Sequence, residues 1–393
     1  MRILLLALIL VAGFVAYATL WPSRFDPVAW QAPPVHALDR DTRPMSALTR
    51  LGIGAGTGPE TVAIGPEGRL YAGYADGTIR RFDADKATGR SDGQVFATTN
   101  GRPLGLAFGP PLPRAKQHQR PDGTSRADRT VADADNAASG DASPGSQRAT
   151  LYVADADQGL LAINRKGQIT ELTSSANGRP FGFTDDVTVA KDGRVYFTDA
   201  SSRWPHTAYR TAILEHHGDG RLLRYDPKTG RTDVLLDGLQ FANGVALGPD
   251  DAYVLVTETG AYRVTRYWLT GPHAGAHDVF IDDLPGFPDG IDADTAHRGF
   301  WIALFAPRNT VLDFAAPYPW LREVIHRLPS WLKPAPAHVG HIVHVANNGH
   351  VISQRIDDSN NAYAPITSVT PAGQWLYLGS LETDAIGRVP AQP

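Results

Sequence analysis

A short strand pattern that recurs six times is the feature that most constrains how this chain folds. Each copy runs from a turn with Gly or Asp, through a short apolar strand with one aromatic residue, to another turn. Examples are RATLYVADADQGLLAIN from residue 148 and GPDDAYVLVTETGAYRVTRYW from residue 248. The aromatic positions are Tyr71, Tyr152, Tyr196, Tyr253, Trp301 and Tyr377. Because repeated strand units of this kind are typical of propeller blades, six copies predict an all-β fold, a six-bladed β-propeller around a central channel.

Two segments interrupt the spacing of the repeats. Residues 110–149 are polar and low in complexity, which predicts a disordered loop insertion. Residues 306–338 carry apolar side chains at helical spacing, which predicts a small helical insert. Those apolar residues are Trp320, Leu321, Val324, Ile325 and Leu328. With both segments set aside, the propeller is expected to span residues 50–390, preceded by a linker at 23–49. A pair of β-sandwiches would not explain the repetition.

Composition excludes several classes of function. The formal net charge is −4, which argues against a surface that binds nucleic acid or another polyanion. The chain has no Cys, so thiol nucleophiles, disulfides and thiolate metal sites are excluded.

The N-terminus carries an uncharged apolar run from Ile3 to Leu20. Its length is at the lower edge of a membrane-spanning helix, and Trp21 after it is a residue type common at membrane interfaces. Residues 1–22 therefore predict a signal anchor, while AYA at 16–18 leaves a cleaved signal peptide open. Arg2 favours a cytoplasmic N-terminus, which would place the bulk of the protein in the periplasm or outside the cell, and secrete it if the leader is cleaved.

Acidic or amide residues stand at the start of an apolar strand in four different repeats. They are Glu60 in GPETVAIGP, Asp185 and Asp186 in FTDDVTVA, Asn243 in FANGVALG and Asp289 in FPDGIDAD. In a propeller the innermost strands begin near the axis, so these side chains are expected to meet at one mouth of the channel. Oxygen ligands suit Ca²⁺ better than Zn²⁺, and packed carboxylates repel one another unless a cation compensates them. Each residue taken alone is more simply explained as part of a turn, a cap or a solvated loop, and only the four together favour a site.

Longer motifs resemble a known family. GRPLGLAFGP, FTDDVTVAKDGRVYFTDASSRW, GRLLRYDPKTGRTDVLLDGLQFANGVALGPDDAYVLVTET and DLPGFPDGI are similar to the strictosidine synthase-like family, in particular its adipocyte plasma-membrane-associated branch. That family lies within the wider gluconolactonase, regucalcin and paraoxonase superfamily. The resemblance covers residues 50–390 and extends to an N-terminal membrane anchor. It implies a six-bladed propeller with Ca²⁺ in the channel, and lactonase or arylesterase activity in many members.

The resemblance also assigns roles residue by residue. By motif, Glu60, Asn243 and Asp289 match metal ligands, and Asp185 stands where the family commonly has Asn. Asp186 matches the following Asp, which in paraoxonases supports a second, structural calcium.

Three departures from the family pattern matter. Gly290 stands where relatives often have a further Asn, and Leu104 stands where paraoxonases carry a catalytic His. The alkaloid-condensing synthases use a Glu in the region that matches YAPITSVTPAG, and no Glu occurs there. This argues against strictosidine synthesis itself.

Taken together, the sequence predicts a calcium-dependent hydrolase of small, apolar esters or lactones. Calcium would polarise the carbonyl, water would attack, and Asp289 or Asp185 would act as general base. Glu60 and Asn243 would be mainly ligands. The alternative is a non-catalytic propeller that binds a ligand or partner and uses a metal for stability only. The helical insert could roof the channel, cover strand edges or touch a membrane surface.

Overall fold

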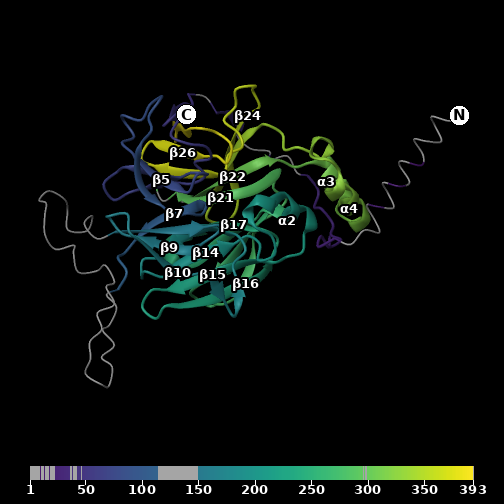
Figure 1. Cartoon of the computed structure of the whole chain (residues 1–393), viewed down its shortest axis with the longest axis horizontal. Coiled ribbons are helices and arrows are strands. Elements are labelled where there is room, and N and C mark those ends of the chain that lie inside the picture. Colours follow the sequence, from purple (N-terminus) through teal and green to yellow (C-terminus); the bar gives the residue numbers. More distant parts are fainter. Residues whose placement is uncertain are drawn as a thin grey trace, which may run out of the picture.

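The computed structural model describes residues 23–35, 38, 42–45, 47–113, 149–294, 296 and 299–392, together with Ile9, Gly13 and Tyr17. Six sheets surround a central axis and form the six-bladed β-propeller that the strand repeat predicts. Figure 1 shows the sheets gathered in one body, with the helices at one side of it. The four main strands of each blade pair antiparallel with their neighbours. The first strands of neighbouring blades contact one another around the axis.

Each blade has its first strand innermost, and the strands follow from the axis outward. Blades 1 and 2 are β3 (Val62–Ile64), β4 (Leu70–Gly73), β5 (Thr78–Phe82), β6 (Gln94–Thr98), and β7 (Pro103–Gly109), β8 (Thr150–Asp155), β9 (Gly159–Ile163), β10 (Ile169–Thr173). Blades 3 and 4 are β13 (Thr184–Val189), β14 (Val195–Asp199), β15 (Gly220–Asp226), β16 (Arg231–Leu239), and β17 (Ala242–Leu247), β18 (Tyr253–Glu258), β19 (Arg263–Trp268), β20 (His277–Ile281). Blades 5 and 6 are β21 (Gly286–Asp294), β22 (Gly299–Pro307), β23 (Gly340–Ala346), β24 (Val351–Asp357), and β25 (Ser368–Ala372), β26 (Trp375–Gly379), β27 (Ile386–Pro390), β2 (Thr49–Leu51).

Strands from the N-terminal part of the chain complete the two last blades. β2 pairs antiparallel with β27, so an early strand is the outermost strand of blade 6 and closes the ring. β1 (Thr42–Pro44) lies parallel to β24 as a fifth strand of blade 5. The range 23–49, expected as a linker, thus contains β1 and the first residue of β2. A separate short hairpin, β11 (Ser175–Ala176) with β12 (Arg179–Pro180), precedes blade 3.

The six repeated aromatic residues all occupy the second strand of their blade, and all are buried. Each belongs to an apolar cluster that is shared between two neighbouring blades. Tyr152 of blade 2, for example, packs with Val187 and Val195 of blade 3. The core is therefore a ring of inter-blade layers, because each twisted sheet buries its apolar face against the next one.

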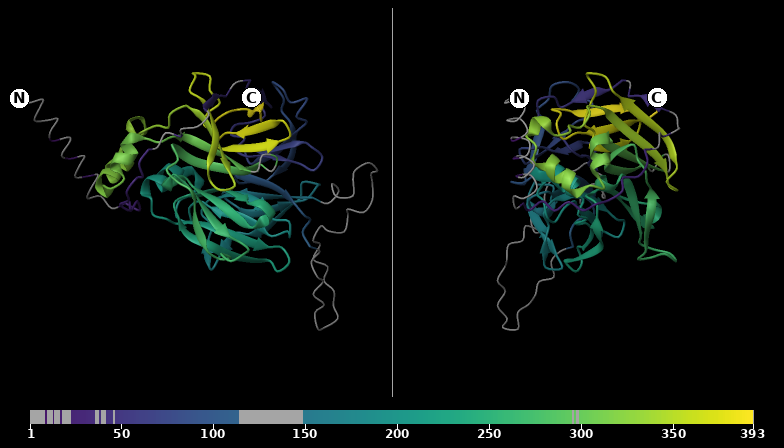
Figure 2. Two further views of the ribbon diagram at one scale, coloured as in Figure 1. Left: turned by 180° about the vertical axis from the view of Figure 1, so that it is seen from behind. Right: turned by 90° about the vertical axis from the view of Figure 1, so that its right-hand side faces the viewer.

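Helices gather at one end of the propeller. The expected helical insert at residues 306–338 contains α3 (Thr310–Ala315), α4 (Pro319–Arg327) and the 3-10 turn η6 (Ser330–Leu332). Asn309 caps α3, since its side chain accepts hydrogen bonds from the N–H groups of Val311 and Leu312. α4 packs against α3 and against α2 (Tyr209–Glu215), a helix that the sequence patterns did not predict. Figure 2 shows α3 and α4 projecting from the body of the propeller.

Shorter 3-10 turns complete the secondary structure. They are η3 (His206–Ala208), η4 (Pro249–Asp251) and η5 (Thr259–Ala261). Most of the expected anchor at residues 1–22 and most of the expected loop insertion at 110–149 lie outside the described residues. Within the described part of the chain, none of the helices has both the length and the apolar character needed to cross a membrane.

Residues 23–35 form an extended segment, the N-terminal strap, that lies along the helices. The N–H of Val28 donates to the carbonyl of Glu215 at 3.0 Å. The ring of Trp30 stacks on His216, with centroids 4.0 Å apart. Arg322 of α4, whose side chain is buried, donates to the Val28 carbonyl and so joins the strap to the helical insert.

Candidate functional site

The residues singled out in the sequence converge at one end of the channel. Glu60, Asp185, Asn243 and Asp289 all line a single cavity of about 460 Å³. Glu60 lies two residues before β3, whereas the other three lie within the innermost strands β13, β17 and β21. They therefore come from blades 1, 3, 4 and 5, and all four side chains are buried. The arrangement follows from the fold, since the inner strands start next to the axis.

Burial dominates the electrostatics of this cluster. It raises the pKa of Glu60 from an ordinary carboxyl value to about 7, although Arg102 nearby acts in the opposite direction. Burial also raises the pKa of Asp185 and of Asp289 well above the ordinary range, and the charge of Glu60 adds to both shifts. A hydrogen bond from the Asn243 side chain partly offsets the shift at Asp289. The carboxyl groups thus disfavour one another's charge, as closely placed acids do in a dry site.

Arg102 belongs to the site although the sequence patterns did not single it out. Its Nη2 atom lies 3.3 Å from Oε2 of Glu60 and donates to the carbonyl of Gly58 at 3.0 Å. Arg102 directly precedes β7, the innermost strand of blade 2, at the end of the loop that corresponds to the loops of the other site residues. This position in the repeat could have indicated Arg102 from the sequence. The sequence patterns pointed only to oxygen-bearing side chains, and a guanidinium group has no oxygen.

Acidic residues at the ends of second strands hold the loops that lead into the site. Asp155, Asp199 and Glu258 are the last residues of β8, β14 and β18, and all three are fully buried. Each accepts backbone N–H groups from the loop that precedes the innermost strand of its own blade. The donors are the N–H groups of Arg102 at 3.1 Å, of Gly182 and Phe183 at 3.0 Å each, and of Gln240 at 2.9 Å.

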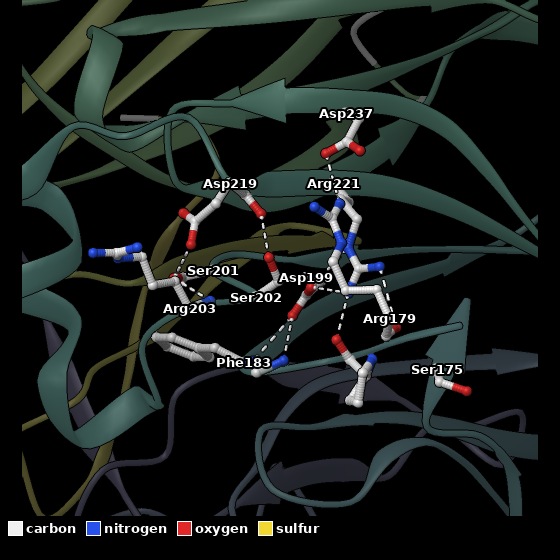
Figure 3. Close-up of polar contacts among 12 residues, drawn as sticks. Ser175, Arg179, Phe183, Asp199, Ser201, Ser202, Arg203, Asp219, Arg221 and Asp237 are labelled. Atoms are coloured by element: carbon white, nitrogen blue, oxygen red, sulfur yellow. Dashed lines mark hydrogen bonds and ion pairs between the residues drawn. The ribbon is translucent and has the colours of Figure 1, made fainter. Parts of the chain in front are cut away.

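In blade 3, the acidic residue that holds the loop is Asp199, and its contacts are the most extensive of the three (Figure 3). Arg221 of β15 lies 2.6 Å from Asp199, and neither side chain is more than 1% exposed. The same guanidinium donates to the carbonyl of Pro180 at 2.8 Å, which fixes the chain just before Phe183. The ring of Phe183 packs edge-on against Phe241 and lines the cavity. Asp185 therefore follows a loop whose backbone is held by Asp199 and Arg221.

Hydroxyl groups lock the backbone of three site residues to the preceding blade. Because these hydrogen bonds run between blades, they fix the distance between neighbouring blades next to the site residues. The bonds are Thr198 Oγ1 to the Asn243 carbonyl at 2.6 Å, Thr257 Oγ1 to the Asp289 carbonyl at 2.6 Å, and Ser368 Oγ to the Glu60 carbonyl at 2.7 Å.

Asp186 does not line the cavity. Its Oδ2 accepts from the N–H of Val245 at 2.9 Å and its Oδ1 from the N–H of Val187 at 2.8 Å. Burial raises its pKa to about 7, while these two bonds act against the shift. In this arrangement Asp186 ties blade 3 to blade 4.

The structure also shows the consequence of two departures from the family pattern. A Cβ atom on Gly290 would meet the carbonyl oxygen of Thr367 at 2.5 Å, and the N–H of Gly290 donates to that same oxygen. The backbone of blade 5 approaches blade 6 too closely there for a side chain. Leu104 lines the cavity and makes its wall apolar at that point.

The upper part of the cavity is lined mainly by apolar side chains from α2, the helical insert and neighbouring loops. They include Ile213, Phe241, Phe287, Phe305, Leu312 and Ile325. His206 and Tyr209 line the cavity as well, and the sequence patterns indicated neither. Nδ1 of His206 lies 3.2 Å from Oδ1 of Asp157, which belongs to blade 2. A polar base beneath apolar walls suits a small molecule with one polar group.

The donor types at the base of the cavity fit a hard divalent cation. Three carboxylates and one amide offer oxygen ligands of the kind that Ca²⁺ prefers. Oδ2 of Asp185 is buried and has no hydrogen-bond partner among the described residues. In the same part of the chain, no three His, Cys, Asp or Glu side chains are grouped closely enough to hold a metal ion. The site thus has suitable donors, but its acidic side chains do not form a closed cluster.

Comparisons with known structures support the fold. A gluconolactonase from Xanthomonas campestris superposes with a TM-score of 0.53 at 16% identity, over 92% of this chain and 98% of that one. A calcium-binding protein, regucalcin, from Agrobacterium tumefaciens gives a TM-score of 0.54 at 12% identity, over 89% of this chain and 95% of its own. At these identities the likeness concerns the propeller fold alone.

Sequence comparisons are more specific. Residues 185–272 match the strictosidine synthase family model, and residues 43–82 match the model of the N-terminal part of strictosidine synthase-like proteins. Strictosidine synthase-like protein 10 of Arabidopsis thaliana is 33% identical over 91% of this chain and 91% of its own length. The adipocyte plasma membrane-associated protein of Bos taurus is 31% identical over 93% of this chain and 84% of its own. With such similarity over nearly the whole length, this chain belongs to the strictosidine synthase-like family.

Proposed function

We propose that the protein is a calcium-dependent hydrolase of small esters or lactones. The observation that carries this proposal is that Glu60, Asp185 and Asp289, with the amide of Asn243, are all buried and line one largely apolar cavity. Uncompensated carboxylates are costly to bury, so their convergence indicates a cation that shares them. The gluconolactonase and regucalcin among the proteins of similar fold are consistent with this chemistry.

The residues have distinct roles in this proposal. Glu60, Asp185, Asn243 and Asp289 would hold the cation through their side-chain oxygens. Bound Ca²⁺ would supply the positive charge that polarises an ester or lactone carbonyl. Asp185 or Asp289 would take the proton from the attacking water, since both carboxyl groups line the cavity. The apolar wall that includes Leu104 orients the substrate and limits the access of bulk water.

The test is metal-dependent hydrolysis by the purified full chain. A panel of esters and lactones should be turned over, turnover should stop with a chelator, and it should return with Ca²⁺. Glu60→Gln and Asp289→Asn should each lower kcat/KM at least a hundredfold, roughly 3 kcal/mol of transition-state stabilisation. Glu171→Gln and Asp358→Asn remove exposed charges of the same types and serve as matched controls. Activity that survives both site variants or the chelator would refute the assignment.

A non-catalytic binding propeller is the second candidate, and one contact favours it. Arg102 already compensates the charge of Glu60 in this structure, which lessens the need for a cation. The cavity also has Leu104 where paraoxonases carry a catalytic His. In this case a chelator lowers the Tm of the protein, but no member of the panel is hydrolysed above the uncatalysed rate.

We further propose that the protein is held at a membrane with its propeller outside the cytoplasm. The apolar run Ile3–Leu20 and the single preceding Arg support this topology. The names of the adipocyte plasma membrane-associated relatives agree with a membrane location. Protease added outside an intact cytoplasmic membrane should digest the propeller domain, whereas a cytoplasmic propeller would be protected.

A further inference from the structure

The helical insert at residues 306–338 exposes an unusual amount of apolar surface. Fourteen large apolar side chains are exposed among the described residues, and six of them lie in this one segment. They are Val311 (50% exposed), Phe314 (66%), Tyr318 (42%), Trp320 (61%), Trp331 (79%) and Leu332 (50%). Single exposed apolar residues are ordinary, but a gathering of four aromatic residues with Val and Leu marks an interaction surface. We call these six residues the apolar face of the insert.

The same segment forms part of the cavity wall. Leu312 and Ile325, on α3 and α4, line the cavity, as do Ser330 of η6 and the Pro334–Pro336 stretch that follows it. The apolar face therefore lies on the helices that enclose the site, with Trp331 directly after a cavity residue. Whatever covers this face also lies next to the cavity.

A contact between α4 and Tyr17 indicates what covers the apolar face of the insert. Arg327 Nη1 donates to the carbonyl of Tyr17 at 3.1 Å, and the Arg327 guanidinium lies 5.3 Å from the centre of the Tyr17 ring. Tyr17 belongs to the apolar run Ile3–Leu20, whose composition suits the interior of a bilayer. α4 thus contacts one described residue of the run that would enter the membrane.

The chemistry of the apolar face also suits lipid. Trp and Tyr are the residues enriched where protein crosses the lipid headgroup region. Both acidic residues of the insert are paired: Glu323 with Arg327 at 2.5 Å, and Asp313 with Arg308 at 3.0 Å. Lys333, which is exposed, adds a positive charge beside Trp331, which favours anionic headgroups.

We infer that the apolar face of the insert is a lipid-docking surface. It dips into the headgroup region of the bilayer beside the N-terminal run, as interfacial helices do. The cavity then lies next to the membrane, and it takes apolar substrates that dissolve in lipid rather than in water. This last clause rests on the proposed hydrolase function, whereas the docking itself does not.

The absence of Cys in the chain allows a direct test with single labels. Trp331→Cys and Phe314→Cys, in the full chain, are labelled with an environment-sensitive fluorophore and reconstituted into phosphatidylcholine–phosphatidylglycerol vesicles. Val95→Cys is the matched control, since Val95 is 49% exposed on the outermost strand of blade 1. Nitroxide-bearing lipids should quench the labels at 331 and 314 several-fold more than the label at 95. Iodide, present on both sides of the membrane, should show the opposite order.

Two outcomes would overturn the docking, and a third would remove only the substrate clause. Equal quenching by iodide at all three positions would mean that the insert faces water. Labels at 331 and 314 that neither quencher reaches would mean that protein covers the face, and cross-linking would tell a second copy from the chain's own N-terminal run. Vesicle docking without any measurable hydrolysis would leave the surface intact but remove the substrate clause. With an active enzyme, Trp331→Ser should raise the apparent KM for a vesicle-borne substrate and leave a short, water-soluble ester unaffected.

Discussion

Some residues of this propeller carry a buried charge. The free energy of unfolding that is lost when one of them is substituted depends on whether its charged partner is left unpaired. Asp199 and Arg221 form a fully buried pair behind the candidate site. Asp199→Asn leaves the guanidinium without its counter-charge, and breaking such a pair costs about 3–5 kcal/mol. We expect a correspondingly lower free energy of unfolding in urea. Asp237→Asn removes the partner of Arg179 in a half-exposed pair of the same region and should cost under about 1 kcal/mol. Equal costs for the two variants would contradict the structural role of Asp199.

Asp185 offers a second residue-level prediction, because it stands where relatives commonly have Asn. Removing its charge takes away repulsion with Glu60 and Asp289, so Asp185→Asn should raise the Tm of the protein in chelator. The same change removes an anionic ligand and should weaken Ca²⁺ binding about tenfold, or ~1.4 kcal/mol. Calorimetric titration and thermal unfolding with and without Ca²⁺ measure both effects. A variant that binds Ca²⁺ as tightly as the wild type would exclude Asp185 as a ligand.

At the scale of elements, the N-terminal strap and α2 meet around a buried histidine. His216 stacks on Trp30, and burial lowers its pKa to about 3, with the charges of Arg322 and Arg263 acting in the same direction. The folded protein therefore binds fewer protons than the unfolded chain between the ordinary histidine pKa of about 6.5 and pH 3. Stability from this group is complete above pH 6.5 and falls as the pH is lowered, by about 2 kcal/mol at pH 5.

This predicts a difference in the pH dependence of unfolding. His216→Phe keeps a stacked ring but cannot be protonated, so it should lose less Tm between pH 7 and pH 5 than the wild type does. His217→Phe, at the exposed neighbouring position, should follow the wild-type curve. Identical slopes for all three proteins would show that His216 is protonated without cost in the folded state. The comparison of slopes cancels any constant effect of Phe on the backbone.

At the scale of the whole molecule, stability depends on closing the ring. Each apolar cluster is shared by two blades, and Leu51 of β2 is a buried member of the cluster that joins the last blade to the first. Leu51→Ala should cost about 2–5 kcal/mol because it empties a fully buried position. Because every blade packs on two others, unfolding should remain a single transition. Val95→Ala, at an exposed position, should change stability by under about 0.5 kcal/mol. A separate early transition in Leu51→Ala would show that blade 6 opens independently.

The sequence alone determined the repeat and, through it, the site. Alternation within short strands set the blades, and the six aromatic residues marked the second strand of each one. Because all innermost strands begin at the axis, the positions of Glu60, Asp185, Asn243 and Asp289 in the repeat were enough to bring them together. Local patterns predict such features well, since they depend on neighbours along the chain.

Only the tertiary structure decided what surrounds these residues. Arg102 reaches Glu60 across 42 positions of sequence, and β2 pairs with β27 from the far end of the chain. The strap, the α2 helix and the exposed face of the insert likewise depend on contacts between distant segments. Gly290 is a further example. The sequence shows only that a side chain expected there is absent, whereas the structure shows that the backbone of blade 6 lies too close to Gly290 for any side chain. Contacts of this kind are set by how whole blades pack, and no local pattern of residues encodes them.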